Sequence, residues 1–369
     1  MHILHIFNEI NFSGAETMYA NAAPLFGEKG FKMTAVSTGK TRGNFVHRFE
    51  EAGIDIIHRP LSLGYKSPFV LLRYFRQMYK YIKNERVDVV HIHRPDIFWY
   101  YAVCAFLAGK KTIVTPHNVF KNRKITWPKA YLERMTARRF FKTTFQTIGE
   151  SVYNNELIYY KNPSIKINNW YDASRFFPPL ENERASVRAE LRIHPDEFVI
   201  ISVGSCSPVK NHADILTALP IVQKNMPCLY LHLGSGSSEE EEKQKAITTG
   251  QQTHVRFLGN QMDVRKYLVA ADIFIMPSRF EGLSIAAIEA MACGLPGVLY
   301  NAPGLVDLIK NDDNGFLISP SPELMAEKII FFQNNRAVIR EKGNNALRFV
   351  NENFNMPKSV CMISELYRK

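Results

Sequence analysis

The segment IFIMPSRFEGLSIAAIEAMACG, residues 273–294, indicates the architecture of this chain. Four apolar residues, Ile273–Met276, precede a polar loop that contains Glu281, and an alanine-rich helix begins near Ser284. A strand that runs through a short loop into an amphipathic helix is the repeating element of a parallel α/β fold. The unpaired N–H groups and the positive dipole end of the helix also make its first turn suitable for binding an anion.

Two carboxylates flank this helix start. Glu281 lies in the loop at the carboxyl end of the strand, and Gly282 lets the backbone approach a ligand closely. Glu289 lies about one and a half turns into the helix, where a carboxylate can accept two hydrogen bonds from a sugar diol such as a ribose. The alternative is that both glutamates are ordinary charges beside a helix. The apolar surroundings of Glu289, IAAIEAMA, favour the binding role, because burying an unpaired carboxylate is costly.

The same alternation of strands and helices runs through the rest of the 369 residues. MHILHIFN at residue 1 and FVIISVGS at residue 198 each form a strand that leads into a loop and a helix. We therefore expect an α/β protein with two Rossmann-like domains facing each other across a cleft. The first domain should cover 1–170 and the second 171–353, with a final helix, about 354–369, packed back on the first.

The expected elements can be given as ranges. Those in the first half are the strands His2–Phe7, Met33–Ser37, Ile54–His58, Val87–Ile92, Lys111–Thr115 and Thr144–Ile148, and the helix Ala15–Lys29. Those in the second half are the strands Phe198–Val203, Cys228–Leu233, Val255–Leu258, Ile273–Met276 and Gly297–Tyr300, and the helix Ser284–Cys293.

The composition argues against several classes of protein. Hydrophobic residues make up 46% of the chain and charged residues 22%, as in ordinary globular proteins. No apolar run reaches the roughly 18 residues of a membrane span, and the first residues read as a strand rather than a signal peptide. The five cysteines are scattered without a C-x-x-C pair, which favours free thiols in a reducing cytoplasm over a disulfide framework or a zinc site.

Positive charge is concentrated in the first half of the chain. Residues 1–170 contain 25 Lys and Arg and 12 Asp and Glu, whereas residues 171–369 contain 21 and 23. Such asymmetry predicts an anionic partner for the first half, and added solubility is the alternative. We expect a membrane or a phosphorylated acceptor rather than nucleic acid, because no nucleic-acid-binding module is recognisable.

The stretch Lys121–Lys142 contains eight of these cations, interleaved with aromatic residues. A basic amphipathic helix of this kind predicts a surface that lies on anionic lipid. The segment Pro68–Glu85 has a similar mixture, and for it a membrane face and a core-packed face are equally open. The cations assigned to a membrane or acceptor surface are Lys121, Arg123, Lys124, Arg134, Arg138 and Arg139.

Three further patterns predict no ligand. His91 and His93 share one strand face, but the sequence offers no third ligand, so we expect no metal there. The acidic run Glu239–Glu242 is expected to be a solvated helix start. Gly234-Ser235-Gly236 lacks the third glycine of a dinucleotide-binding fingerprint.

The segment around Glu281 and Glu289 resembles the E-x7-E signature of the retaining glycosyltransferases of the GT-B fold, family four. The resemblance extends along nearly the whole chain and its pieces occur in the family's order. The other matching pieces are Ser13-Gly14-Ala15-Glu16, Thr115-Pro116-His117, Asn169-Trp170-Tyr171-Asp172 with Phe176, Val203-Gly204, Lys210-Asn211, Gly234-Ser235-Gly236 and Phe257-Leu258-Gly259.

The resemblance implies a role for each matching residue. It places His117 near the donor sugar, Lys210 against the departing diphosphate and Glu281 on hydroxyls of the transferred sugar, and these three are the expected catalytic residues. Ser205 stands where the family usually has an arginine, so one of two phosphate cations is replaced here. The expected donor-binding residues are Gly14, Ser205, Lys210, Gly259, Glu281, Gly282, Leu283, Ser284 and Glu289.

We therefore expect a retaining hexosyltransferase that uses a nucleotide diphosphate sugar, UDP- or GDP-linked, and no metal or other cofactor, because the chain contains no D-x-D. The expected acceptor is a lipid-linked or other saccharide in the synthesis of a cell-surface polysaccharide such as capsule or O-antigen. The expected location is cytoplasmic, peripheral on the inner face of the plasma membrane. Two alternatives are a GT-B transferase with a small soluble acceptor and a non-catalytic module that binds nucleotide sugars.

Overall fold

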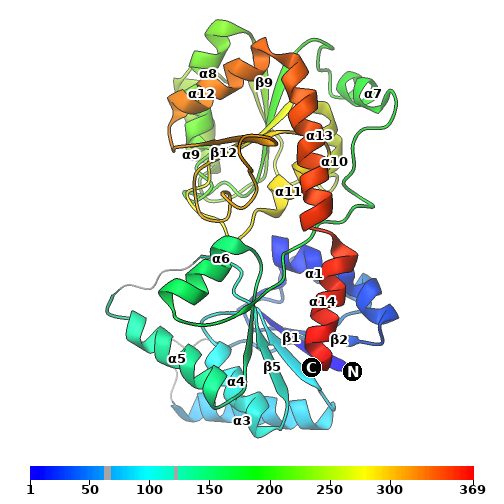
Figure 1. The fold of residues 1–369 in the computed structure, drawn as a ribbon, viewed down its shortest axis with the longest axis vertical. Coiled ribbons are helices and arrows are strands. Elements are labelled where there is room, and N and C mark those ends of the chain that lie inside the picture. The colour runs from blue at the N-terminus through cyan, green and yellow to red at the C-terminus, as the bar shows by residue number, and fades with distance from the viewer. Residues whose placement is uncertain (62–67, 120–123) are drawn as a thin grey trace. The chain divides into compact units, whose positions relative to one another are not determined.

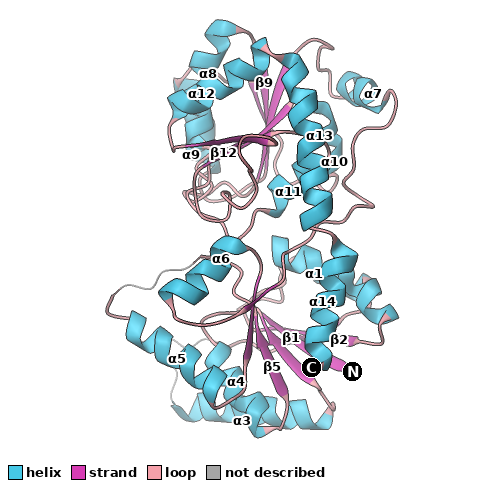
Figure 2. Cartoon of the chain, viewed as in Figure 1, coloured by secondary structure: helices cyan, strands magenta, loops and turns pink. Residues whose placement is uncertain are grey.

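A computed structural model describes residues 1–61, 68–119 and 124–369. The chain divides into two compact units, which Figure 1 colours from blue at the N-terminus to red at the C-terminus. The first unit combines Met1–Trp170 with the terminal segment Met356–Lys369, and the second is Tyr171–Asn355. Each unit is a parallel sheet with packed helices, so the predicted α/β class is confirmed (Figure 2).

Within the described residues, the first unit has a seven-stranded parallel sheet in the order β3-β2-β1-β4-β5-β6-β7. Its strands are β1 (His2–Phe7), β2 (Lys32–Ser37), β3 (Asp55–His58), β4 (Val89–Ile92), β5 (Lys111–Val114), β6 (Thr144–Thr147) and β7 (Ile165–Lys166). Its helices are α1 (Gly14–Glu28), α2 (Val46–Glu51), α3 (Pro68–Asn84), α4 (Phe98–Leu107), α5 (Trp127–Arg139), α6 (Glu150–Asn154), the π-helical turn η1 (Asn155–Tyr159) and α14 (Met356–Arg368).

The second unit has a six-stranded parallel sheet with the equivalent order, β10-β9-β8-β11-β12-β13. Its strands are β8 (Phe198–Val203), β9 (Cys228–Leu233), β10 (Val255–Phe257), β11 (Ile273–Met276), β12 (Gly297–Tyr300) and β13 (Gly315–Ile318). Its helices are α7 (Glu183–Glu190), α8 (Ala213–Asn225), α9 (Glu239–Thr248), α10 (Val264–Ala270), α11 (Ile285–Ala292), α12 (Pro322–Asn334) and α13 (Arg336–Asn353).

The eleven predicted strands are present, several of them shorter by a residue or two at one end. The sequence analysis missed two edge strands. β7 has only two residues, both exposed, and therefore shows no hydrophobic pattern. β13 follows the polar run KNDDNG, and its four residues are too few to be separated from a turn by periodicity.

The last helix, α14, packs against α1 in the first unit. Its Tyr367 is buried, and the phenolic oxygen lies 2.7 Å from Nδ1 of His91 on β4. Ser359 donates a hydrogen bond of 2.9 Å to the carbonyl of Asn168. These contacts attach the end of the chain to the core of the first unit.

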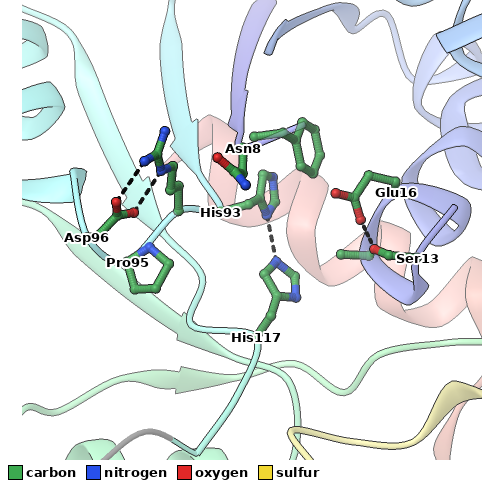
Figure 3. A pocket seen from close by; sticks show the side chains of 10 residues that line it. Asn8, Ser13, Glu16, His93, Pro95, Asp96 and His117 are labelled. Carbon is green, nitrogen blue, oxygen red and sulfur yellow. Dashed lines mark hydrogen bonds and ion pairs between the residues drawn. The ribbon is translucent and has the colours of Figure 1, made fainter. Parts of the chain in front are cut away.

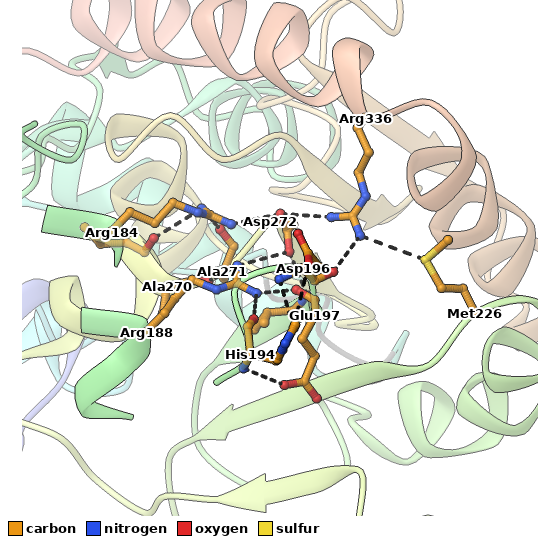
Figure 4. Close-up of polar contacts among 12 residues, drawn as sticks. Arg184, Arg188, His194, Asp196, Glu197, Met226, Ala270, Ala271, Asp272 and Arg336 are labelled. Atoms are coloured by element: carbon orange, nitrogen blue, oxygen red, sulfur yellow. Dashed lines mark hydrogen bonds and ion pairs between the residues drawn. The ribbon is translucent and has the colours of Figure 1, made fainter. Parts of the chain in front are cut away.

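The amino ends of the central strands in the second unit are held by Asp272, the residue before β11 (Figure 4). Its Oδ2 accepts a hydrogen bond of 2.7 Å from the backbone N–H of Val199 in β8. Its Oδ1 accepts hydrogen bonds from Arg184 at 2.8 Å and from Arg336 at 3.4 Å. This ion-pair network serves the fold, because the ligand-binding loops of such a sheet lie at the opposite, carboxyl edge.

Candidate functional site

The strand order reverses at the same place in both sheets, between β1 and β4 and between β8 and β11. In open parallel sheets this switch point opens a crevice beyond the carboxyl ends of the strands, where ligands bind. The residues that follow these strands in each unit are therefore the candidates for a functional site.

In the second unit, Lys210 and Glu281 form an ion pair across the switch point. Lys210 lies in the loop after β8, and its Nζ is 2.7 Å from Oε1 of Glu281 in the loop after β11. Both side chains are largely buried, at 21% and 13% exposed. The loop of Glu281 is fixed because its backbone N–H donates to the carbonyl of Pro303 at 2.9 Å. Two residues that were assigned separate donor contacts from the sequence thus lie side by side.

The segment Gly282–Ser284 provides buried backbone donors beside this pair. Ser284 is the N-cap of α11, and its Oγ accepts a hydrogen bond of 3.3 Å from the N–H of Ala287. In the part of the chain that the structure describes, the N–H groups of Gly282, Leu283 and Ser284 have no backbone or side-chain acceptor. Buried N–H groups are nearly always paired, so these three are suited to an anionic ligand at the helix start.

Glu289 lies farther along α11, and burial raises the pKa of its carboxyl to about 8. The nearby cation Arg175 lowers this pKa and the carboxylate of Asp172 raises it, both less than burial does. No described residue donates a hydrogen bond to the Glu289 side chain. The side chain is only partly exposed, so a carboxyl without a donor is unfavourable there, and a ligand that brings two hydroxyl groups would satisfy it.

Three glycine-containing loops meet at the same edge of the second sheet. A Cβ on Gly234 would lie 1.9 Å from the carbonyl oxygen of Gly204, so this contact requires glycine. Gly234 also donates a hydrogen bond of 2.8 Å to the carbonyl of Gly259, which has a φ of +63°. Ser205 directly follows Gly204 in the chain and is exposed. Ser205 therefore lies in the same loop as Lys210, and Gly259 contacts the neighbouring loop through Gly234; their role in donor binding stays a prediction.

In the first unit, a cavity of about 380 Å³ opens at the carboxyl ends of β1 and β4 (Figure 3). His117 lies at this cavity, as does the loop next to Gly14. The lining residues are Phe7, Asn8, Ser13, Ala15, Glu16, His93, Arg94, Pro95, Asp96 and His117. Seven of these ten residues have polar or charged side chains, so the cavity offers hydrogen-bonding groups to a hydroxylated ligand.

His117 ends a row of hydrogen-bonded imidazoles. Its Nε2 lies 2.8 Å from Nδ1 of His93, whose Nε2 lies 2.9 Å from Nδ1 of His5. Burial lowers the pKa of His117 to about 4 and that of His5 to about 3, and it also lowers the pKa of His93. The three rings are therefore neutral at pH 7. Each neutral ring has one N–H, so the row couples the tautomer of His117 to those of His93 and His5.

Glu16 lies in the first turn of α1 and faces the same cavity (Figure 3). It accepts a hydrogen bond from the hydroxyl of Ser13. Burial raises the pKa of Glu16 to about 7, so the carboxyl can gain or lose a proton near neutral pH. Gly14, assigned to the donor diphosphate, begins this helix.

The sequence analysis missed several residues of this cavity. Arg94 donates two hydrogen bonds of 2.8 Å to Asp96 and one of 2.9 Å to the hydroxyl of Thr38. His93 was considered only as a metal ligand. The signal was available, because HRPD directly follows strand β4, and residues just beyond the carboxyl end of a central parallel strand are site candidates.

Two buried clusters contain enough donor atoms to be considered for a metal. One adds His5 to His91 and His93, so the expectation that the pair has no third partner was wrong. The nitrogens of His91 already have partners, at 2.7 Å from the hydroxyls of Tyr367 and Thr115. The second cluster contains Glu242. The acidic run begins helix α9 as expected, but Glu242 is buried, so the expectation that this helix start is solvated was wrong for that residue.

The structure corrects the assignment of Arg134 to a membrane surface. The side chain of Arg134 is only 11% exposed and forms hydrogen bonds of 2.8 and 2.9 Å with the carboxylate of Glu156. The guanidinium also lies 3.8 Å from the ring centre of Tyr160. Removing one partner of a buried pair costs about 3–5 kcal/mol, so Arg134 stabilises the fold of the first unit.

The other cations that were assigned to this surface are either exposed or outside the described residues. Lys124, Arg138 and Arg139 are exposed, and Lys121 and Arg123 lie outside the described residues. The helix α3 has one face packed in the core and another face that is exposed, and membrane contact by this helix stays a prediction. Met78 and Ile82 are buried in the core, whereas Phe69 and Leu72 are 81% and 68% exposed. No helix in the described part of the chain has the length and the apolar composition needed to cross a membrane.

Comparison with known proteins supplies the family. Residues 183–349 match the model for glycosyl transferases group 1, and residues 12–153 match the model for glycosyltransferase family 4. An Escherichia coli UDP-Gal:alpha-D-GlcNAc-diphosphoundecaprenol alpha-1,3-galactosyltransferase is 27% identical, over 79% of this chain and 77% of its own. The Bacillus anthracis N-acetyl-alpha-D-glucosaminyl L-malate synthase is 22% identical over the same shares.

Solved structures show the same fold. The structure of Anabaena HepE in complex with UDP and glucose superposes with a TM-score of 0.85, at 18% identity and 99% coverage of both chains. A glycosyltransferase from Rickettsia africae gives a TM-score of 0.84, at 19% identity, with 100% of this chain and 97% of that chain covered.

Proposed function

The chain belongs to the group 1 glycosyltransferases of the GT-B fold, and we propose that it is a retaining enzyme that moves a sugar from a nucleoside diphosphate to a lipid-linked or saccharide acceptor without a metal ion. The observation that carries the proposal is the carboxyl edge of the second sheet. There a lysine, three unpaired backbone N–H groups and two glutamates gather at the switch point.

These groups correspond to the parts of a nucleotide diphosphate sugar. The N–H groups of Gly282–Ser284 and the ammonium of Lys210 suit the diphosphate, whose negative charge grows as the bond to the sugar breaks. Glu289 suits the ribose diol, which would satisfy its carboxyl. Glu281 suits hydroxyls of the transferred sugar, and the Lys210–Glu281 pair keeps both side chains in place before the donor arrives.

The absence of a D-x-D sequence supports chemistry without a bound metal, because that motif commonly holds the cation in other transferases. Lys210 and the start of α11 would neutralise the leaving group instead. No carboxylate of the chain is assigned as a nucleophile, so we propose same-face attack assisted by the leaving phosphate. His117, kept neutral by burial, would contact the sugar as a hydrogen-bonding group rather than as a cation.

The UDP and glucose complex of HepE and the name of the Escherichia coli relative support a UDP-linked donor and an acceptor on a lipid diphosphate, as in the synthesis of a cell-surface polysaccharide. The first unit offers a surface for such a membrane substrate. Phe69, Leu72, Arg73 and Arg76 of α3 are exposed, which combines apolar and cationic groups on one helix. We propose that this face rests on the cytoplasmic side of an anionic membrane, with Arg138 and Arg139 adding charge.

The proposal is tested by measuring thermal stability with UDP, GDP, ADP and their sugar conjugates, since a ligand of the folded state raises its apparent stability. The preferred donor is then supplied with a lipid-diphosphate saccharide acceptor, and the anomeric configuration of the product is read by NMR. We expect transfer with retention at a rate that added Mg²⁺ or Mn²⁺ does not increase.

An inverted product would contradict retention. A rate that requires Mg²⁺ or Mn²⁺ would contradict the metal-independent mechanism. Transfer to a soluble acceptor but not to a lipid-linked one would replace the acceptor proposal. Donor binding without transfer to either would support the non-catalytic alternative.

A further inference from the structure

Four buried side chains at the carboxyl edge of the second unit bring together a thiol, two imidazoles and a carboxylate. They are Cys206, His212, His232 and Glu242, none more than 2% exposed. One donor atom of each lies within 4.8 Å of the other three. The four residues come from separate places: the loop after β8, the residue before α8, strand β9 and the first turn of α9.

The separations recorded between these atoms are close to those between the ligands of a tetrahedral metal site. Nε2 of His232 lies 3.0 Å from Oε2 of Glu242, 3.1 Å from Nδ1 of His212 and 3.8 Å from Sγ of Cys206. Nδ1 of His212 lies 3.5 Å from Oε1 of Glu242. Around a tetrahedral zinc ion, nitrogen or oxygen ligands lie about 3.3 Å apart and sulfur and nitrogen about 3.6 Å apart, from bond lengths of about 2.0–2.3 Å.

Hydrogen bonds within the cluster cannot satisfy all of its polar atoms. Nε2 of His232 has either one hydrogen or one lone pair, yet three polar atoms face it. His212 and His232 both also lie against the buried carboxylate of Glu242. One proton on Nε2 can serve only one of these contacts, whereas a cation between the four donor atoms would satisfy all of them.

We propose that Cys206, His212, His232 and Glu242 bind a structural zinc ion. A divalent cation with one thiolate, one carboxylate and two neutral imidazoles has no net charge, which removes the cost of a buried anion. This mixture of sulfur, nitrogen and oxygen ligands suits Zn²⁺ rather than Mg²⁺ or Ca²⁺, which prefer oxygen. Four protein ligands close the site, so the ion has no open position for a substrate and takes no part in the sugar transfer.

The ion would fix the loop that presents Lys210. Cys206 and His212 lie four residues before and two residues after Lys210. The backbone of Cys206 is also tied to the loop after β9, because its N–H donates to Ser235 at 3.1 Å and its carbonyl accepts from Ser238 at 3.0 Å. Zinc would therefore join the loop after β8 to β9 and α9, and hold Lys210 in reach of Glu281.

The test uses the full chain without an affinity tag, expressed with added zinc and dialysed against metal-free buffer that contains EDTA. Metal content is measured by mass spectrometry. A second sample is unfolded with a chelator, refolded with Co²⁺ and read for the thiolate charge-transfer band in the near ultraviolet and the strong visible bands of tetrahedral cobalt. We expect about one zinc per chain and both cobalt signals.

Variants assign the ligands. Cys206→Ser should abolish the thiolate band, and Glu242→Gln, which keeps the shape of the side chain, should lower zinc content and thermal midpoint. Cys228→Ser is the matched control, because Cys228 is a buried free thiol on β9 outside the cluster, and it should keep the zinc.

Zinc that stays bound in folded Cys206→Ser with unchanged stability would overturn the ligand assignment. If Cys206→Ser does not fold, the wild-type protein decides the question. Folded wild-type protein with less than about a tenth of an equivalent of zinc and no cobalt band would show that the cluster is a hydrogen-bond network. Neither result depends on the sugar-transfer assay, so the zinc proposal and the proposed function can fail separately.

Discussion

The two units use one strand order to present different chemistry at the same edge of the sheet. In the first unit the edge holds three hydrogen-bonded imidazoles, those of His5, His93 and His117, and burial keeps them neutral by lowering their pKa values. The ion pair at this edge is formed by Arg94 and Asp96, which are close in sequence. In the second unit, Lys210 and Glu281 form an ion pair. The topology decides where polar side chains gather, and the partners within each group decide whether they are charged.

The charged edge of the second unit should matter most for the rate. Lys210→Ala should lower the turnover rate at saturating donor by about 100-fold or more, because the departing diphosphate loses a stabilising cation. The measurement is steady-state transfer kinetics, with Lys243→Ala as the control, since Lys243 pairs with glutamates on the surface of α9.

The partner of Lys210 allows a sharper form of this experiment. If Lys210 serves only to neutralise Glu281, Lys210→Ala should have little further effect in protein that already contains Glu281→Gln. We expect Lys210→Ala to lower the rate by a similar factor in both backgrounds, because the lysine is assigned to the phosphates, and a double-mutant cycle measures the difference.

Glu289 should control affinity rather than rate. Two hydrogen bonds of about 0.5–1.5 kcal/mol each would be lost, so Glu289→Ala should weaken nucleotide binding by about 10- to 100-fold in calorimetry. Unchanged affinity would contradict the ribose assignment. The isosteric Glu289→Gln should also alter how the free energy of unfolding depends on pH. The folded pKa of about 8 lies above the unfolded value of 4.5, so the wild type loses stability as pH rises through this window and the variant does not.

The basic charge of the first unit should control membrane binding. Near an anionic surface each Lys or Arg contributes about 1 kcal/mol, so replacing Arg73 and Arg76 by Glu should reduce binding to anionic vesicles about 30-fold or more. The measurement is co-sedimentation at low and high salt, because screening weakens such binding. Replacing Arg138 and Arg139 by Glu tests α5 in the same way, whereas Arg134 is unsuitable because it is buried. Equal binding to neutral and anionic vesicles would refute an electrostatic surface.

Protonation of the neutral imidazoles should lower the free energy of unfolding in acid. The unfolded pKa of a histidine is 6.5 and the folded pKa of His5 is about 3, so this group stabilises the fold above pH 6.5 and the stabilisation is lost as pH falls towards 3. At pH 5 the loss is about 2 kcal/mol, from 1.36 kcal/mol per pH unit. Urea unfolding of His5→Phe should show a smaller decrease between pH 7 and pH 5 than the wild type. An equal decrease in both proteins would show that His5 is protonated in the folded state.

Several features were predictable because they depend on local pattern. The strand, loop and helix of residues 273–294 appear as β11 and α11, and Glu281 and Glu289 lie on the loop and on the helix as expected. Lys210 and His117 follow their strands as the order of motifs implied. Periodicity and loop chemistry act over a few residues, so a single sequence contains the information that they need.

The sequence by itself determined the α/β class, the strands that carry the candidate site and the excess of positive charge in the first half. Only the tertiary structure decided which polar groups meet. Arg134 reaches Glu156, 22 positions away, and becomes a buried ion pair instead of a surface cation. Glu242 belongs to an acidic run in the sequence, but its side chain is buried against His212 and His232. The physical reason is that ionisation and burial depend on neighbours brought together by the crossovers of the sheet, and no local pattern encodes those neighbours.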